Sequence, residues 1–150
     1  MIKKEKYINN IPQELKERSQ WLWFKIYHNK DKYGNIKTVK IPISPITFES
    51  NEWNKKENWA DFATALAGLE KSGCDGLSFI LSEDDPFVCI DLDDVEETVF
   101  KMFQVDFRDT YKEISQSGKG VHIFVRGQIE KNFNNQIEKV EMYQENRCIA

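Results

Sequence analysis

The sequence predicts an α+β domain with a mostly antiparallel sheet and flanking helices. Two observations predict this class. Short apolar segments with alternating polar residues, rich in aromatic and β-branched side chains, recur along the chain, and two longer segments carry apolar residues at helical spacing. With 150 residues, 40% of them apolar and 31% charged, the chain is long enough for one folded domain over residues 1–150 and too short for two ordinary ones.

The first half of the chain is predicted to form a hairpin followed by a helix. The segments "WLWFKIY" and "VKIPIS", residues 21–27 and 39–44, are rich in strand-forming residues, and the polar, glycine-containing link between them suits a turn. The segment "NWADFATALAGLEKSG", residues 58–73, has helical apolar spacing, with Asn58 as the expected N-cap and Gly73 at the end.

The second half is predicted to contain most of the sheet. Strands are expected over residues 77–81, 87–92, 110–115, 121–125 and 139–143, and a helix is expected over residues 95–107. The apolar face of that helix is predicted to consist of Val95, Val99, Met102 and Phe103. Acidic residues in its first turn suit the helix dipole.

The composition excludes several classes of protein. No apolar run approaches the roughly 20 residues that span a bilayer, and the N-terminus lacks the apolar segment of a secretory signal, so we expect a cytoplasmic protein that does not contact membranes. Cys74, Cys89 and Cys148 lie far apart and without a neighbouring CxxC, which favours reduced thiols over disulfides or a zinc site.

Charge is distributed unevenly along the chain. The net charge of −4 argues against a basic surface that wraps duplex nucleic acid. Residues 83–113 carry eleven acidic side chains against three basic ones, whereas residues 25–40 carry five lysines against Asp31 alone. The acidic segment would repel phosphate unless cations were bound to it, and the basic segment would attract phosphate. An ordinary solvated surface is an alternative explanation for both segments.

Two carboxylates stand close together on the strand predicted over residues 87–92. Because side chains alternate along a strand, Asp91 and Asp93 share one face while Ile90 and Leu92 face the core. The carboxylates are then roughly 7 Å apart, close enough to converge on two cations about 4 Å from each other. Aspartate is a poor strand former, and bound cations would offset the repulsion between the pair.

His122 and Glu141 occupy equivalent positions on two other predicted strands. Each has apolar neighbours on both sides, so each points away from the core. Periodicity allows the three outward faces to be one face of the sheet. A solvent-facing position explains each of these polar residues when it is taken alone.

The segment "SQSGKG", immediately before the strand of His122, combines groups that bind phosphate. Glycine allows backbone N–H groups to approach closely, serine donates hydrogen bonds and lysine supplies charge. The candidate residues are Ser115, Ser117, Gly118, Lys119 and Gly120. The segment lacks the spacing of a Walker A motif, and a tight hairpin turn also explains its glycines.

In this order, the motifs resemble those of the N-terminal catalytic domain of phage and plasmid primase-polymerases, in the archaeo-eukaryotic primase superfamily. The resemblance spans nearly the whole chain, from "WLWFK" and "KIPISP" through "CIDLDD" and "SGKGVHIF" to "VEMYQENRCIA". Asp91 and Asp93 match the DxD motif of the family, His122 its SxH-like motif, and Glu141 its third acidic residue. The resemblance implies an RRM-like catalytic half beside an N-terminal α/β module.

The resemblance also implies metal-dependent, template-directed nucleotidyl transfer. Asp91, Asp93 and Glu141 would bind two Mg²⁺ or Mn²⁺ ions and, together with His122, would form the catalytic set. His122 and the segment "SQSGKG" would hold the triphosphate of an incoming NTP or dNTP.

Arg147 and Lys40 are further candidate nucleotide contacts. Arg147 resembles the arginine that follows the E-x-Y of the family, and Lys40 belongs to the basic hairpin, which could hold template or nucleotide by charge and stacking. The expected partners are a single-stranded DNA template with its primer and a replicative helicase, in trans or in the full-length protein. The implied context is the replication of a phage, a plasmid or another mobile element.

The chain departs from the family in two places. Gln116 stands where relatives usually have proline, and the chain stops at Ala150, where relatives continue into further strands and often into a helicase. We therefore expect a domain shortened at its C-terminus. Two alternatives stay open: a nucleotide- or single-strand-binding module with the same fold and little activity, and a metal-dependent nuclease.

Overall fold

The computed structural model describes residues 4–115 and 118–150, and the chain divides into two compact units. The first unit comprises the chain up to Ile80 together with Ala150, and the second comprises Leu81–Ile149. Each unit combines helices with a sheet whose strands pair in antiparallel fashion, which confirms the predicted α+β class. The expectation of a single domain stays a prediction.

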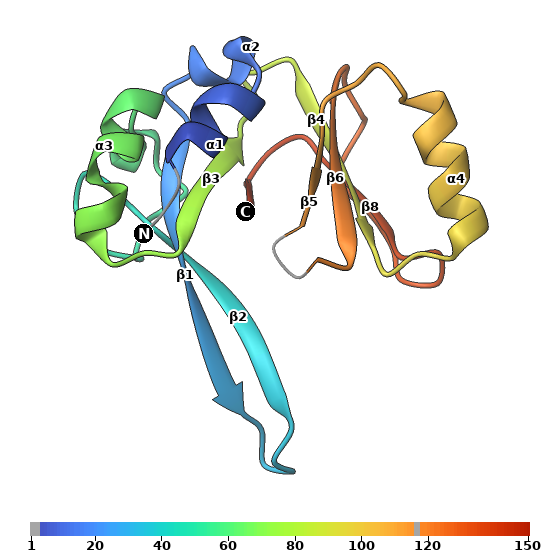
Figure 1. Ribbon diagram of the computed structural model, residues 1–150, viewed down its shortest axis with the longest axis horizontal. Helices are drawn as coiled ribbons and strands as arrows, with labels where there is room; N and C mark the ends of the chain where they lie inside the picture. Colours follow the sequence, from blue (N-terminus) through green and yellow to red (C-terminus); the bar gives the residue numbers. More distant parts are fainter. Residues whose placement is uncertain (1–3, 116–117) are drawn as a thin grey trace. The chain divides into compact units, whose positions relative to one another are not determined.

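The first unit is built on a hairpin and one further strand. Its elements are α1 (Lys4–Asn10), α2 (Gln13–Lys16), β1 (Trp21–Lys30), β2 (Ile36–Ile43), a 3-10 helix (Lys56–Asn58), α3 (Phe62–Ser72) and β3 (Gly76–Leu81), as Figure 1 shows. Strand β1 lies between β2 and β3.

Two tryptophans of β1 attach this sheet to α3. The indole N–H of the buried Trp23 donates to the carbonyl oxygen of Ala65, 2.7 Å away. The ring of Trp21 meets those of Phe62 and Phe79 edge to face, with centroids 5.1 Å apart in both cases. Aromatic area removed from water therefore contributes much of the stability of this unit.

Helix α3 begins later than the sequence predicts. Its N-cap is Asp61, whose carboxylate accepts the backbone N–H of Thr64 at 2.8 Å, and Gly73 ends it with a φ of 68°. The prediction of Asn58 as the cap is wrong. Asn58 lies in the 3-10 helix, where its side-chain amide donates to the carbonyl oxygen of Glu52.

The second unit is a five-stranded sheet with one helix on one face (Figure 1). Its elements are β4 (Phe87–Asp93), α4 (Glu97–Asp106), β5 (Lys112–Ile114), β6 (Gly120–Arg126), β7 (Phe133–Asn135) and β8 (Val140–Tyr143). The short strand β9 (Arg147–Ile149) follows them and is not one of the five strands of this sheet. The strand order of the sheet is β5-β6-β4-β8-β7. Strand β4, which carries the aspartate pair, is therefore central, with β6 on one side and β8 on the other.

Helix α4 covers the apolar face of that sheet. The buried cluster beneath it consists of Ile90, Leu92, Ile123 and Val140. Val95, Val99 and Phe103 pack against the cluster as predicted, but Met102 is 65% exposed, and Phe100 packs there instead. Burying the ring of Phe100 removes more apolar area from water than burying Met102 would.

The remaining differences from the sequence prediction concern short elements. Helices α1 and α2, the 3-10 helix, β7 and β9 were not predicted, because segments of three to seven residues carry too little periodicity. The three cysteines are free, as expected. Among the described residues, none of the helices has the length and apolar character that a membrane crossing requires.

Candidate functional site

Five polar side chains form a row across the sheet of the second unit, on the face opposite the apolar cluster. Asp91 lies directly opposite His122 of β6 and Glu141 of β8, and the row continues to the edge strands on both sides. In order across the sheet, the row consists of Glu113, His122, Asp91, Glu141 and Asn134. The structure thus brings Asp91, His122 and Glu141 together, and directly opposed side chains in such a sheet are close enough to interact.

His122 is the buried centre of a short hydrogen-bond chain. It is only 4% exposed, and its Nδ1 lies 3.0 Å from Oε1 of Glu113. The second carboxylate oxygen of Glu113 accepts the hydroxyl of Tyr111 at 2.9 Å. Nε2 of His122 lies 3.7 Å from Oδ1 of Asp91. The imidazole is therefore oriented by Glu113 and presents its other nitrogen to the aspartate.

Asp91 is a carboxylate in an unfavourable position. Burial raises the pKa of the Asp91 carboxyl, the nearby His122 side chain opposes this rise, and the carboxylate of Glu141 adds to it. Arg147 opposes the rise and Asp93 adds to it, both more weakly. An additional positive charge at this point would favour the ionised form.

Glu141 is held by three neighbours. Its Oε1 accepts the side-chain amide of Asn134, and its Oε2 accepts the hydroxyl of Tyr143 at 2.5 Å. The guanidinium of Arg147 lies 3.6 Å from the same Oε2 and 4.2 Å from the centroid of the Tyr143 ring. Burial and the bond to Glu141 raise the pKa of Tyr143 to about 12, so its hydroxyl keeps its proton at neutral pH.

Asp93 and the phosphate-binding candidates lie at one end of β4. Asp93 is exposed and pairs with Gly120 across the β4–β6 ladder. Oγ of Ser115 accepts the backbone N–H of Gly120 at 3.0 Å, so this hydroxyl already supports the loop. Gly118 turns the chain with a φ of 75°, and Lys119 is exposed beside it. Ser117 and Gln116 lie outside the described residues.

Gly120 must be glycine because the strands approach closely there. An added Cβ would lie 2.6 Å from the carbonyl oxygen of Leu92 and 3.0 Å from Oγ of Ser115. We therefore expect Gly120→Ala to lower the free energy of unfolding by about 1–3 kcal/mol, measured by urea denaturation. Gly127→Ala is the matched control, since no atom lies within 4 Å of an added Cβ there, and its effect should stay within about 0.5 kcal/mol. Equal effects of the two substitutions would contradict the close-approach argument.

Lys40 belongs to the first unit. It lies on β2, and its Nζ donates to the carbonyl oxygen of Ala150 at 2.6 Å and stands 6.0 Å from the centroid of the Phe24 ring. These contacts are with the first unit itself and say nothing about a nucleotide.

The acidic residues suit a divalent cation by their chemistry. Mg²⁺ and Mn²⁺ prefer carboxylate oxygens, and Asp91 and Glu141 present such oxygens side by side, with Asp93 two residues along the strand. Within residues 4–115 and 118–150, no group of three or more His, Cys, Asp or Glu side chains is already arranged to hold a metal ion. Each carboxylate oxygen of Glu141 already accepts one hydrogen bond, from Asn134 and from Tyr143, and keeps a second lone pair for a cation.

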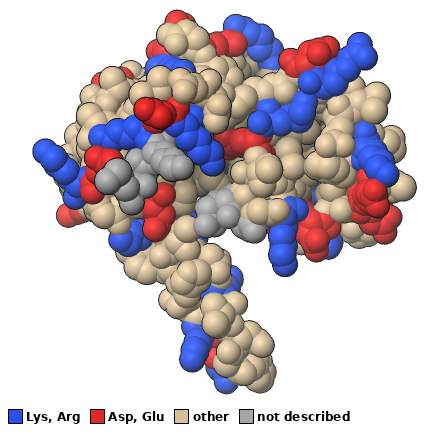
Figure 2. Space-filling model, viewed as in Figure 1, with Lys and Arg blue, Asp and Glu red and all other residues tan. Residues whose placement is uncertain are grey.

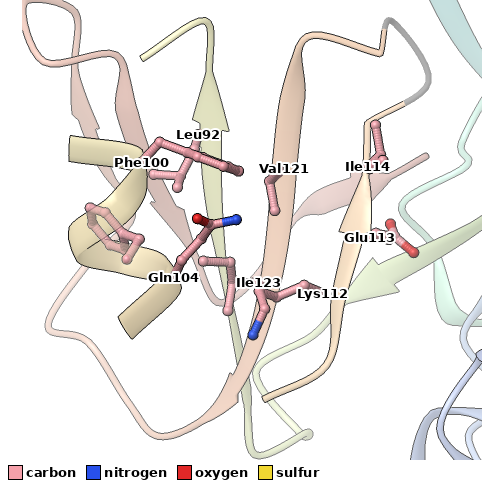
Figure 3. Close-up of a pocket in the computed structure, with 9 residues that line it drawn as sticks. Leu92, Phe100, Gln104, Lys112, Glu113, Ile114, Val121 and Ile123 are labelled. Carbon is pink, nitrogen blue, oxygen red and sulfur yellow. The ribbon is translucent and has the colours of Figure 1, made fainter. Parts of the chain in front are cut away.

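A cavity of about 230 Å³ lies on the other face of the sheet, between the sheet and α4. Figure 3 shows the side chains that line it, among them Leu92, Phe100, Gln104, Val121 and Ile123. Most of this lining is apolar and belongs to the core face. The cavity is therefore mainly a packing gap beneath a half-buried helix, and Glu113, at one end of the polar row, also belongs to its lining.

Four further residues hold the row together. Glu113, Tyr111, Asn134 and Tyr143 were not predicted, although each binds His122, Glu113 or Glu141. The segment "TYKEIS" was predicted as a strand, and its Glu113 could have been proposed as a partner of His122 only if the β5–β6 register had been known.

Comparison with known proteins finds a phage protein of similar sequence. No model of a known protein family matches the chain. A DNA primase-polymerase of Nitratiruptor phage NrS-1 is 32% identical over 130 residues, which cover 81% of this chain. The chain spans only 17% of the length of that phage protein. Over most of its length, this chain is therefore related in sequence to a part of a phage primase-polymerase.

Proposed function

We propose that this chain is a nucleotidyl-transfer domain of the primase-polymerase kind, which adds NTP or dNTP to a primer or a first nucleotide as a DNA template directs. The observation that carries the proposal is the alignment of Asp91, His122 and Glu141 on three neighbouring strands. The sequence relationship to a phage primase-polymerase supports it. The reaction would serve the replication of a phage, a plasmid or another mobile element.

Asp91, Asp93 and Glu141 are the residues proposed to hold two Mg²⁺ or Mn²⁺ ions. Such ions, when bound, would favour the nucleophilic form of the attacking hydroxyl and neutralise charge on the departing pyrophosphate. Asp91 is central because its buried carboxylate has a raised pKa and gains most from a neighbouring positive charge. Glu141 lies directly beside it, on β8.

The groups proposed to bind the triphosphate flank these carboxylates. His122 presents Nε2 on the same face, and Arg147 lies beside Glu141. Gly118, Lys119 and Gly120 belong to the turn that leads into β6, where the exposed Lys119 would supply an ammonium to phosphate oxygens. The backbone N–H groups of Gly118 and Gly120 donate to the carbonyl oxygen and to Oγ of Ser115, so phosphate would have to replace these bonds to reach them. Ser115, Ser117 and Lys40 stay candidates from the sequence.

Template-directed transfer is tested by primer extension. The protein, a labelled primer on a single-stranded template, NTP or dNTP, and Mg²⁺ or Mn²⁺ should yield extended primer, and a parallel reaction without primer tests initiation. Binding of nucleotide triphosphate without incorporation would favour the binding-module alternative. Metal-dependent loss of DNA without added nucleotide would favour the nuclease. A helicase, in trans or in a longer form of the protein, is the proposed unwinding partner.

A further inference from the structure

The hairpin of β1 and β2 extends well beyond the sheet of its own unit. Register pairs continue from Tyr27 opposite Val39 to Lys30 opposite Ile36, and nearly every residue from 27 to 38 is exposed. Figure 1 shows this two-stranded ribbon projecting from the first unit. We call residues 27–39 the arm. A ribbon exposed on both faces buries little apolar area, so its own stability does not explain its length.

The lysines of the arm are exposed, whereas those at the base of the hairpin bind backbone carbonyl oxygens. Lys30, Lys32 and Lys37 are exposed, as the blue atoms on the projecting ribbon in Figure 2 illustrate. At the base of the hairpin, by contrast, Lys25 and Lys40 donate to backbone carbonyl oxygens, those of Gly73 and Ala150.

The one acidic residue of the arm is occupied by the turn at its tip. The carboxylate of Asp31 accepts the backbone N–H groups of Tyr33 at 2.8 Å and Asn35 at 2.9 Å, and the side-chain amide of Asn35 at 3.0 Å. The side-chain bond from Asn35 and the backbone bonds lower the pKa of Asp31. Asp31 therefore shapes the tip, and the lysines around it leave a net positive surface.

Two exposed tyrosines accompany these lysines. Tyr33 is 78% exposed at the tip, with Nζ of Lys32 5.0 Å from its ring centroid. Tyr27 is 43% exposed, and the register places it on the same face as Lys37, because Lys37 is two residues from Val39, the partner of Tyr27. Tyr33 thus has an ammonium over its ring, and Tyr27 shares a face of the ribbon with a lysine. Single strands are bound by this combination of aromatic rings for bases and cations for phosphates.

We infer that the arm binds single-stranded nucleic acid, with Tyr27 and Tyr33 stacking on bases and Lys30, Lys32 and Lys37 pairing with phosphates. Part of the inference rests on the proposed function, because a template-directed enzyme must hold an unpaired strand. The charge argument is independent of the proposed function. In a chain of net charge −4, the arm presents three exposed lysines, and the one acidic residue in its sequence, Asp31, binds the backbone of the turn.

The electrostatic part is tested by anisotropy with a short labelled oligothymidylate, without nucleotide or metal. Lys30→Gln/Lys32→Gln/Lys37→Gln should bind about 100-fold more weakly than the wild type at about 0.1 M salt, and the slope of log K against log salt should become shallower by about 2. The control Lys6→Gln/Lys71→Gln/Lys131→Gln loses the same charge from exposed positions off the arm. Equal weakening of both triple variants would overturn the inference.

The stacking part is tested with Tyr27→Ser/Tyr33→Ser. This variant should bind the single strand about tenfold more weakly and leave binding to a duplex of the same length unchanged, since duplex bases are already stacked. Wild-type binding that favours the duplex, or tyrosine substitutions that change nothing, would overturn the inference. The two proposals can fail separately, because strand binding tests the arm and primer extension tests nucleotidyl transfer. An Asp91→Asn variant should bind the single strand as the wild type does and should not extend primers.

Discussion

Asp91→Asn is expected to reduce nucleotide incorporation by at least about 100-fold, or ~2.7 kcal/mol of activation free energy, without unfolding the protein. The substitution keeps the shape of the side chain and removes the central carboxylate of the row. Primer extension measures the loss. In an unfolding scan, Mg²⁺ or Mn²⁺ should raise the melting temperature of the wild type and leave that of the variant unchanged.

The same substitution has a predictable effect on stability in metal-free buffer. Folding raises the pKa of the Asp91 carboxyl. The protonated Asp91 side chain therefore contributes its full stability below the pKa of the unfolded chain, near 4. This contribution is lost as the pH rises through the pKa of the folded protein. Asparagine has no charge to bury. The variant should therefore be at least as stable as the wild type at neutral pH, and this advantage should shrink as the pH falls towards about 4.

Asp94→Asn is the matched control for both measurements. Asp94 follows β4 directly, and a side-chain bond from Lys139 lowers its pKa, which is the opposite direction from Asp91. Its φ of 55° is one that asparagine tolerates. This variant should extend primers normally and be slightly less stable at neutral pH. Loss of incorporation in both variants, or retention in both, would contradict the role given to Asp91.

The face of each strand could be predicted from the sequence, but the pairing between strands could not. Alternation around Ile90 and Leu92 is strong enough to turn Asp91 outward, and the same holds for His122. That Asp91 lies opposite both His122 and Glu141 depends on the order β6-β4-β8, in which no two neighbours are consecutive in the chain. Long-range pairing of this kind has no signature in a local pattern.

Other errors have local physical causes. The pattern predicts Asn58 as the N-cap, whereas the structure places Asp61 there, because the path of the backbone brings the Asp61 carboxylate to the first turn. Residues 28–30 and 36–38 lack apolar alternation, so the sequence predicts a polar link there, yet their backbones pair as a ladder. The contact of Glu113 with His122 could not be predicted because it depends on the β5–β6 register, which has no local signature in the sequence.

Glu113→Ala is expected to weaken nucleotide incorporation about 10–100-fold through its effect on His122. Oε1 of Glu113 lies 3.0 Å from Nδ1 of His122 and orients the imidazole. The other carboxylate oxygen of Glu113 accepts the hydroxyl of Tyr111. Without it the imidazole loses its fixed orientation, so the apparent affinity for nucleotide should fall more than the affinity for DNA. Steady-state kinetics with varied nucleotide, and strand binding without nucleotide, measure the two separately.

Conservative variants show whether Glu113 acts by orienting the His122 imidazole or only by filling space beside it. Glu113→Gln keeps an oxygen that can face Nδ1 and should restore part of the lost activity. Tyr111→Phe removes only the bond that steadies Glu113, so its effect should be smaller than that of Glu113→Ala. Glu83→Ala, at an exposed position in the turn before β4, is the control for loss of a negative charge.

A double substitution decides whether Glu113 acts through His122. His122→Ala alone should weaken nucleotide binding more than DNA binding, because the imidazole presents Nε2 to the carboxylate row. If Glu113 only positions that imidazole, its removal has no further effect once the imidazole is absent, so the double variant should match His122→Ala. Additive losses would show that Glu113 has a separate role, for example in holding β5 against β6. Circular dichroism and urea unfolding of each variant ensure that the folded proteins are compared.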